Sequence, residues 1–514
     1  MIILYHNGAT VVELANANTF NIDKASRKSI ASVLIEVAKN YPEEILVWCD
    51  IDFKVQLNVS VIEKLLHHKK VILSYNPSNI PFLDLAIGYV DESPFIKVNK
   101  EVTFPTWQMS SKVGAVHSQV LLALKERLPF DKDFDYFLCS WAKVTMPLGL
   151  LCYSEPQLLK SDVYIATPKA SIYTLFRFVK QHYRSRWLFL LLLDFLLYER
   201  KFPLLPFLWA LFYKNRNNSN INLENINVQS TRKRTERSID VIIPTIGRKE
   251  YLHDVLLDFA KQTLLPNTII IVEQNPDEES KSELDYITDE KWPFKIQHIF
   301  THQAGACNAR NVALQQTLSE WVFFADDDIC IEPDFLQKGI EKATRFGAKA
   351  FSVSCLQKGQ KQIFKTVFQW VTFGSGCSFV LAESLKGCQF NKGYEFGFGE
   401  DGDFGMQLRN QGDDVLYLPQ PEILHLKAPV GGFRTKPVLQ WQNDTIQPKP
   451  SPTIMLYQIL HNTQEQRLGY KTILFLKYYR HQKIKNPIRY FSYFQKQWKR
   501  SVYWAKELKK QNEI

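Results

Sequence analysis

The sequence predicts an α/β protein whose second half holds a mostly parallel sheet, preceded by an N-terminal α/β domain and followed by a helical, basic C-terminal tail. Three observations support this prediction. Short apolar runs of strand length alternate with helical patterns of apolar residues. An Asn-rich stretch at 214–237 separates the two halves, and basic residues crowd the C-terminal end. A chain of 514 residues is too long for one compact core, so several domains are expected.

Residues 1–165 are predicted to form an α/β accessory domain. Ile45–Cys49 and Val71–Ser74 are apolar runs of strand length, whereas Ser29–Lys39 and Val116–Arg127 repeat apolar residues at helical spacing. This region holds no strong chemical motif.

One acidic pair in the first domain has two interpretations. Asp50 and Asp52 follow a predicted strand, where carboxylates can hold a metal ion. An exposed acidic turn is the commoner use of such residues, and we favour it.

Residues 166–213 are predicted to be an apolar helical segment. Trp187–Tyr198 and Phe202–Tyr213 are mainly apolar, and Glu199–Lys201 divides them with three charges. Spanning a bilayer takes about 20 uninterrupted apolar residues, so each half is too short. Two interpretations stay open: packing within or between domains, and a segment that lies in a membrane interface. The polar stretch at 214–237 follows as a linker.

Residues 238–440 form the domain that carries the chemistry. Val241–Ile243 and Thr268–Val272 are typical of strands buried on both faces, and Tyr251–Ala260 between them has helical spacing. Strand, helix and strand in this order imply a right-handed parallel crossover, and ligands bind at the carboxyl ends of such strands. The polar residues expected at those ends are Thr245, Arg248 and Glu273.

A third predicted strand, Trp321–Ala325, runs directly into Asp326, Asp327 and Asp328. Three adjacent carboxylates repel one another, so a cation is their natural partner. Oxygen ligands suit Mg²⁺ or Mn²⁺. The alternative is an acidic turn that caps the next helix.

Two further motifs follow downstream. Glu400 and Asp401 lie between glycines at the expected start of a helix, where carboxylates are favoured. Beside a metal site, the pair is suited to general-base work. His425 follows another short apolar run, where a lone histidine is usually a core residue. The acidic motifs nearby favour a metal-ligand role instead.

These motifs together resemble family-2 glycosyltransferases of the GT-A fold, which is Rossmann-like. The resemblance covers about 200 residues and rests on the order of VIIPTIGR, AKQT, IIVEQN, GACNARNVAL, FFADDDI and GFGEDGDFGMQLRNQG. It implies an inverting transferase that uses a nucleotide-diphosphate sugar, with a UDP-sugar favoured, and a divalent metal, Mg²⁺ or Mn²⁺. The implied acceptor is a glycan or a lipid-linked molecule, in cell-surface glycan synthesis.

The resemblance also implies roles for individual residues. The nucleotide-sugar pocket would comprise Pro244, Thr245, Arg248, Glu273, Gly305, Arg310, Asn311, Asp326, Asp327 and Gly376. The metal would be held by Asp326, Asp328 and His425, although the triplet also permits Asp327 as a ligand. Asp401, with Glu400, would supply the catalytic base. A solvated carboxylate titrates near ~4, so Asp401 is expected to be ionised at neutral pH.

Two residues depart from the pattern that the family shows. Glu273 stands where an Asp is frequent, and Ile246 replaces the common Tyr or Asn. Both changes bear on which nucleotide is bound. The N-terminal region has a fainter likeness to the same fold, without its full acidic motifs, and is therefore expected to be an accessory or degenerate GT-A-like domain.

The tail at 441–514 holds the net charge of the chain. From Lys471 onward there are 12 Lys and Arg against 2 Asp and Glu, which equals the net charge of +10. Aromatic residues interleave with these bases, and Ile488, Phe491, Phe494 and Trp498 are predicted to share one helical face. Such a helix either lies on an anionic membrane or packs on the catalytic domain with a solvated basic rim. Nucleic-acid binding is not expected, because no recognition motif accompanies the charge.

Cysteine usage and the N-terminal residues bear on location. The eight cysteines form no CxxC pair and several lie in apolar runs, which predicts buried free thiols in a reducing compartment. No secretory signal pattern begins the sequence. A cytoplasmic protein, peripheral on the inner face of the plasma membrane if it contacts lipid, is therefore expected.

Two functions compete with glycosyl transfer. A GT-A-like domain could serve as a non-catalytic scaffold for a partner glycosyltransferase, although the intact acidic residues argue against that. A metal-dependent nucleotidyltransferase also needs paired acids at a strand end, but it leaves the Glu400 and Asp401 motif without a role.

Overall fold

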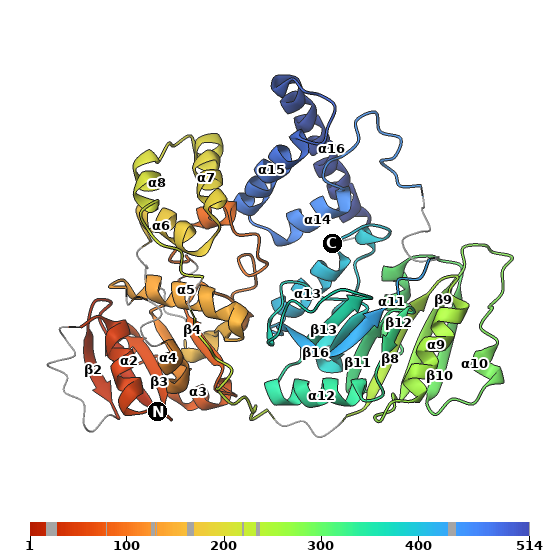
Figure 1. The fold of residues 1–514 in the computed structure, drawn as a ribbon, viewed down its shortest axis with the longest axis horizontal. Coiled ribbons are helices and arrows are strands. Elements are labelled where there is room, and N and C mark those ends of the chain that lie inside the picture. The colour runs from red at the N-terminus through yellow and green to blue at the C-terminus, as the bar shows by residue number, and fades with distance from the viewer. Residues whose placement is uncertain are drawn as a thin grey trace. The chain divides into compact units, whose positions relative to one another are not determined.

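The computed structural model describes residues 1–512 except 17–27, 79, 125–128, 130, 162–168, 218–219, 233–236 and 430–437. The chain divides into two compact units (Figure 1). Unit 1 comprises Met1–Arg232 and Thr463–Leu476, and unit 2 comprises Lys233–Asn462 and Lys477–Ile514. The α/β fold class predicted from the sequence is confirmed, because each unit is built on its own mixed sheet.

Unit 1 holds a seven-stranded sheet in the order β2-β1-β3-β6-β4-β7-β5. The pairs β1/β3 and β4/β7 are parallel, whereas β6 runs antiparallel to both β3 and β4. The strands are β1 (Ile2–His6), β2 (Val11–Ala15), β3 (Ile45–Asp50), β4 (Val71–Tyr75), β5 (Phe104–Pro105), β6 (Val113–His117) and β7 (Leu151–Ser154).

Helices of unit 1 bury an apolar core that includes Trp48, Trp107 and Trp141. The α-helices are α2 (Ile30–Asn40), α3 (Val59–Leu65), α4 (Ser118–Leu124), α5 (Phe134–Thr145), α6 (Ile172–His182), α7 (Ser185–Asp194), α8 (Leu204–Ala210) and α15 (Gln464–Tyr479). Shorter turns are η1 (Ile51–Phe53), η2 (Leu85–Tyr89), η3 (Met146–Leu148), η4 (Pro156–Leu158) and the π-helical η5 (Phe195–Glu199).

Unit 2 holds a nine-stranded sheet in the order β10-β9-β8-β11-β15-β13-β16-β12, and β14 pairs with β16. Strands β10, β9, β8 and β11 are parallel, as the predicted crossover requires. The strands are β8 (Ile239–Thr245), β9 (Thr268–Gln274), β10 (Lys295–Thr301), β11 (Trp321–Ala325), β12 (Ile329–Ile331), β13 (Ala350–Gln357), β14 (Phe368–Gln369), β15 (Cys377–Leu381) and β16 (Val415–His425).

Helices of unit 2 include two that begin at the edge of the sheet where the acidic motifs lie, α11 and α13. The α-helices are α9 (Lys249–Ala260), α10 (Tyr286–Asp289), α11 (Ala306–Leu314), α12 (Phe335–Phe346), α13 (Glu400–Asn410), α14 (Pro452–His461) and α16 (Pro487–Gln511). The 3-10 turns are η6 (Ala382–Leu385) and η7 (Lys392–Tyr394).

Several predicted elements agree with the structure within a residue or two, and one does not. The run Val116–Arg127 is not one helix, because Val116 and His117 end β6 and α4 begins at Ser118. Strand β6 is buried along its whole length between two neighbouring strands, which explains the apolar residues that the helical pattern absorbed. Lys125, Glu126 and Arg127 lie outside the described residues.

The C-terminal region is divided between the units, unlike the single tail predicted at 441–514. The Gln466 side chain donates to the carbonyls of Asp91 and Ser93, each at 3.0 Å. Gly469 lies so close to the backbone of Tyr89 that a Cβ atom would be 2.2 Å from its oxygen. Thr463–Leu476 therefore packs with unit 1.

Helix α16 packs within unit 2 through part of the predicted face, because Phe494 is buried and Trp498 packs against the apolar core. Tyr490, Phe494 and Ala505 are buried, while Ile488 and Phe491 are exposed. Ala505 belongs to the same apolar cluster as Met455 and Leu456 of α14. The interpretation of a helix packed on the catalytic domain thus describes α16.

The thiol prediction is correct in one respect and wrong in another. All eight cysteines are free, but Cys330 is exposed and Cys355, Cys377 and Cys388 are half-buried. The alternation of side chains along β12 turns Cys330 away from the buried Ile329 and Ile331.

A buried carboxyl group lies among the helices of unit 1. Tyr198 and Asp194 flank the hydroxyl of Thr472, which donates to Asp194 Oδ1 at 2.5 Å. Asp194 Oδ2 is buried and has no hydrogen-bond partner among the described residues. Burial raises the pKa of Asp194 to about 7.

The Asp194→Asn variant tests whether burial raises the pKa of this carboxyl group. Because folding raises the pKa, the folded state keeps a proton that the unfolded state loses near ~4, so stability falls as pH rises from ~4 to about 7. The Asn variant should lack this loss. We expect it to unfold several degrees above the wild type at pH 8 and equally at pH 4, in thermal unfolding of the full chain. The exposed Glu224→Gln change serves as control, and identical pH profiles for wild type and Asp194→Asn would contradict the assignment.

Candidate functional site

A cavity of about 800 Å³ opens at the carboxyl ends of β8 and β11. Most of the residues predicted to bind the nucleotide sugar, the metal or the acceptor proton line it. These are Pro244, Thr245, Arg248, Gly305, Arg310, Asp326, Asp327, Asp328, Gly376, Glu400, Asp401 and His425. Residues far apart in sequence therefore meet in one place, which is what parallel neighbouring strands produce.

The carboxylate of Asp327 is fully engaged by neighbouring side chains. It accepts from Thr245 Oγ1 at 2.7 Å and from Arg248 Nη1 at 2.5 Å. Burial raises its pKa to about 6, although Arg248 acts in the opposite direction. Asp327 thus positions Arg248, and both of its oxygens are engaged by neighbouring side chains.

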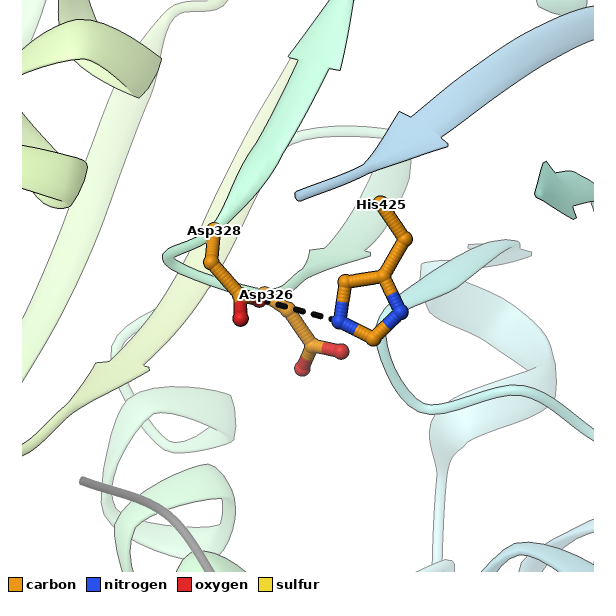
Figure 2. Close-up of side chains that lie close together, drawn as sticks. All are labelled: Asp326, Asp328 and His425. Atoms are coloured by element: carbon orange, nitrogen blue, oxygen red, sulfur yellow. Dashed lines mark ion pairs between the residues drawn. The ribbon is translucent and has the colours of Figure 1, made fainter. Parts of the chain in front are cut away.

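Asp326, Asp328 and His425 form a group of potential metal ligands (Figure 2). One ligand atom from each lies within 4.8 Å of the others. His425 Nε2 is 3.2 Å from Asp328 Oδ1, and the carboxylate raises the pKa of the imidazole. Two carboxylates and an imidazole gathered at neighbouring strand ends are a donor set that fits a divalent cation.

Asp328 is fixed by the backbone as well. The amide of Ala428 donates to its Oδ2 at 2.8 Å, and the amide of Leu426 donates to its carbonyl at the same distance. The chain that follows β16 therefore holds Asp328 and His425 in register. Asp326 is more open, with 35% of its side chain exposed, and its partner is Arg310 Nη2 at 3.2 Å.

Gly376 is required by its closeness to Asp326. A Cβ atom at this position would lie 2.0 Å from Asp326 Oδ2. Any side chain would displace the carboxylate from the strand end. The glycine predicted from the sequence is therefore a spatial requirement of the acidic site.

Asp401 lies at the start of α13, where the amide of Ser375 donates to its Oδ1 at 3.1 Å. It is not the solvated carboxylate that we expected, because burial raises its pKa above the ordinary value. The neighbouring Glu400 is shifted further, to about 7, by burial and by the charge of Asp401. Its Oε2 has no hydrogen-bond partner among the described residues.

Helix α11 is anchored by a residue that the sequence analysis missed. Glu395 accepts from the amides of Cys307 and Asn308 at 3.1 and 3.0 Å, which caps the helix. A Cβ on Gly305 would lie 2.4 Å from its carboxyl carbon. The contact fixes the start of the helix, and with it Arg310, which lies about one helical turn further along and lines the cavity.

Two predicted nucleotide-binding residues do not line the cavity. Glu273 Oε2 pairs with His298 Nε2 at 2.9 Å, and Glu273 is not among the residues that line the cavity. Asn311 forms two 2.7 Å hydrogen bonds with the backbone of Phe390. Gln274 lines the cavity instead and accepts from the amide of Gly305 at 2.6 Å.

Comparisons with known proteins show that part of unit 2 is similar to glycosyltransferases. Residues 240–394 match the sequence profile of the family described as Glycosyl transferase family 2. A relative from Haemophilus influenzae, described as an uncharacterized glycosyltransferase, is 28% identical over 103 residues, which is 20% of this chain. The chain spans about a third of that relative, 33% of its length.

Solved structures of S. aureus TarS are also similar. One TarS chain is 16% identical, covers 47% of this chain and 43% of its own, and has a TM-score of 0.33. TarS 1–349 in complex with UDP-GlcNAc is 19% identical, covers 48% of this chain and 72% of its own, and has a TM-score of 0.34. The match of residues 240–394 to the Glycosyl transferase family 2 profile agrees with the resemblance expected from the sequence motifs.

Proposed function

We propose that unit 2 transfers a sugar, with inversion, from a nucleotide-diphosphate sugar to a hydroxyl group of a glycan or lipid-linked acceptor. A UDP-sugar is the favoured donor. One observation carries the proposal: a single cavity holds both the ligand group Asp326, Asp328 and His425 and the shielded carboxylate of Asp401. A transferase that displaces a diphosphate needs both features in reach of one substrate.

The donor side of the proposed site is built for negative charge. Arg310 and Arg248 approach the cavity from α11 and from the start of α9, and both contact the acidic triplet. A Mg²⁺ or Mn²⁺ ion held by Asp326, Asp328 and His425 would supply further positive charge for the leaving diphosphate. Arg310 would stabilise the same charge from the protein side.

The acceptor side depends on Asp401. A sugar hydroxyl is a weak nucleophile until its proton is removed, and a carboxylate of raised pKa is a better proton acceptor than an ordinary one. The Ser375 amide fixes one oxygen of Asp401. The Ser375 side chain also hydrogen-bonds to this carboxylate, so Ser375 holds the proposed base in place.

The exposed apolar surface of α7, η5 and α8 supports a peripheral membrane contact, which we also propose. Phe189, Leu205, Trp209 and Phe212 are 57%, 69%, 60% and 86% exposed. The exposed basic residues around this surface are Arg184, Arg186, Arg200, Lys201 and Lys214. Apolar and aromatic side chains ringed by bases suit the interface of an anionic bilayer. None of the described helices has the length and apolarity to cross one.

The first prediction of this function concerns the base. Asp401→Asn removes the proton acceptor and nearly preserves its shape, so sugar transfer should fall by roughly 10²-fold or more. Donor affinity, measured by calorimetry with UDP, should change little. The exposed Asp285→Asn change in the same unit is the matched control. Normal transfer by Asp401→Asn would make the motif structural and the assignment wrong.

A second prediction concerns the cation. Excess chelator should abolish transfer, and Mg²⁺ or Mn²⁺ should restore it. Asp328→Asn should weaken metal and donor binding together, because the change removes one ligand and loosens His425. Asp334→Asn, at a side chain that is 41% exposed, should do neither. Full activity in excess chelator would show that the reaction does not need the metal. Donor hydrolysis assayed with and without acceptor distinguishes a glycosyltransferase from a nucleotidyltransferase and from a non-catalytic scaffold.

The membrane proposal is tested with the full chain and vesicles of mixed phosphatidylglycerol and phosphatidylcholine. Leu205→Asp combined with Trp209→Asp places charge in the exposed apolar surface and should reduce co-sedimentation at least several-fold. Leu318→Asp, at a residue 94% exposed on unit 2, is the control. Undiminished binding by the double variant, with loss on changing Ile488 and Phe491, would assign the contact to α16 instead.

A further inference from the structure

Unit 1 repeats the strand arrangement of the catalytic unit. In unit 1, β1 and β3 are parallel, β6 is antiparallel to β3 and β4, and β7 is parallel to β4. In unit 2, the same relations hold for β8 and β11, for β15 with β11 and β13, and for β16 with β13. Strand β5 pairs antiparallel with β7, as β14 pairs with β16.

The register of these strands aligns individual residues. Cys49 pairs with Val113 in unit 1, as Ala325 pairs with Cys377 in unit 2. The next residue along β3, Asp50, therefore occupies the place of Asp326. By the same register, Ser111 and Lys112 correspond to Ser375 and Gly376.

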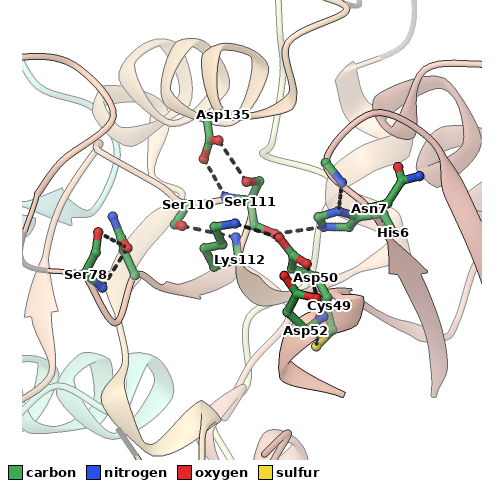
Figure 3. Close-up of polar contacts among 12 residues, drawn as sticks. His6, Asn7, Cys49, Asp50, Asp52, Ser78, Ser110, Ser111, Lys112 and Asp135 are labelled. Carbon is green, nitrogen blue, oxygen red and sulfur yellow. Dashed lines mark hydrogen bonds and ion pairs between the residues drawn. The ribbon is translucent and has the colours of Figure 1, made fainter. Parts of the chain in front are cut away.

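A second correspondence between the units involves the helices α5 and α13. Helix α5 precedes β7 as α13 precedes β16. The amide and hydroxyl of Ser111 donate to Asp135 at 2.7 and 2.8 Å, as the amide of Ser375 donates to Asp401 (Figure 3). Asp135 thus holds the place of the proposed base.

The donor half of the site is absent from the described part of unit 1. Of the acidic turn that we favoured from the sequence, Asp52 is exposed as expected, but Asp50 is buried. Lys112 replaces the glycine, and its Nζ lies 2.7 Å from Asp50 Oδ2, which occupies the carboxylate (Figure 3). The remaining oxygen of Asp50 accepts from the Asp52 amide at 3.2 Å. The antiparallel β2 lies beside β1 where the parallel β9 lies beside β8, so the strand ends that would hold a nucleoside are missing there.

The acceptor half is retained as a small cavity. It has a volume of about 80 Å³ and lies beyond the end of β4, next to Asp135. Its lining includes Tyr75, Phe95, Phe104, Gln108, Ser110 and Asp135. Gln108 is half-buried. Within the described part of the chain, its backbone amide donates to Thr106, and its side-chain amide group forms no hydrogen bond.

This lining has the chemistry of a sugar site. Aromatic faces pack against the C–H groups of a pyranose ring, and carboxylate and amide groups pair with its hydroxyls. A nucleotide sugar needs a cavity of several hundred Å³, on the scale of ~300–1,000 Å³ for small-molecule sites. The unit 1 cavity lies well below this scale, which excludes a nucleotide sugar.

We propose that unit 1 is a glycan-binding module, in which this cavity holds one sugar residue of the acceptor chain through Asp135, Gln108 and the surrounding aromatic rings. The inference rests on the proposed transfer to a glycan acceptor. Binding away from the reacting end gives the enzyme a second hold on the acceptor and raises its local concentration.

The test uses saturation-transfer difference NMR on the full chain with methyl glycosides of glucose, galactose and N-acetylglucosamine, without donor. At least one glycoside should bind the wild type and bind Asp401→Asn equally. Gln108→Ala and Asp135→Asn should each weaken that binding by roughly tenfold or more. Gln119→Ala, at another half-buried glutamine of unit 1 that lies outside the cavity lining, is the control. Unfolding temperatures show whether Asp135→Asn folds, and Gln108→Ala carries the test if it does not.

Two outcomes overturn the proposal. One is that none of the three glycosides binds. The other is that binding survives Gln108→Ala but is lost in Asp401→Asn, which places the sugar in the catalytic unit. Glycoside binding by a chain that fails to transfer sugar would count against the proposed function alone. Transfer by a chain that does not bind glycosides would count against the glycan-binding module alone.

Discussion

The repulsion among three adjacent carboxylates at the end of β11 governs the structure around them. Each carboxylate has partners of its own: Thr245 for Asp327, His425 and the Ala428 amide for Asp328, and Arg310 for Asp326. Arg248 is shared between Asp327 and Asp328. Like charges at this spacing disfavour ionisation, so partners of opposite charge are needed to keep the group ionised. The partners come from β8, α11 and β16, and the cavity exists because these elements converge on β11.

The elements that converge on β11 also give the carboxyl groups of the cavity different degrees of burial. Asp326 is half-exposed at the cavity, whereas Asp327 is buried and Glu400 has an oxygen without a partner among the described residues. Burial raises the pKa of Asp327 and of Glu400, while neighbouring donors oppose that rise. Carboxyl groups of one chemical type are thereby suited to different tasks: a charge that binds, a charge that positions, and a group that exchanges a proton.

The strands and the acidic motifs of unit 2 were predictable from sequence, because buried parallel strands are continuous apolar runs that end where polar residues begin. Which side chains contact one another in the folded site was not predictable from the sequence. Glu273 and Gln274 are successive residues at the end of β9, and the sequence does not show that Glu273 pairs with His298 of β10 while Gln274 lines the cavity. Glu395 caps α11 from 88 residues away. In unit 1, Asp50 and Asp135 lie far apart in sequence. Their correspondence with Asp326 and Asp401 follows from the register of β3 with β6 and from the hydrogen bonds between Ser111 and Asp135.

The contrast between Gly376 and Lys112 shows how one residue sets what a strand end can bind. With no side chain at 376, the Asp326 carboxylate lies over the backbone and keeps its oxygens open toward the cavity. At the corresponding place in unit 1, the Lys112 ammonium group is itself the cation, held 2.7 Å from Asp50. An internal ammonium is permanent, whereas a metal ion brings further coordination positions for a diphosphate. The same strand arrangement therefore leaves room for the proposed cation and donor where the residue is glycine, and has its carboxylate neutralised where the residue is lysine.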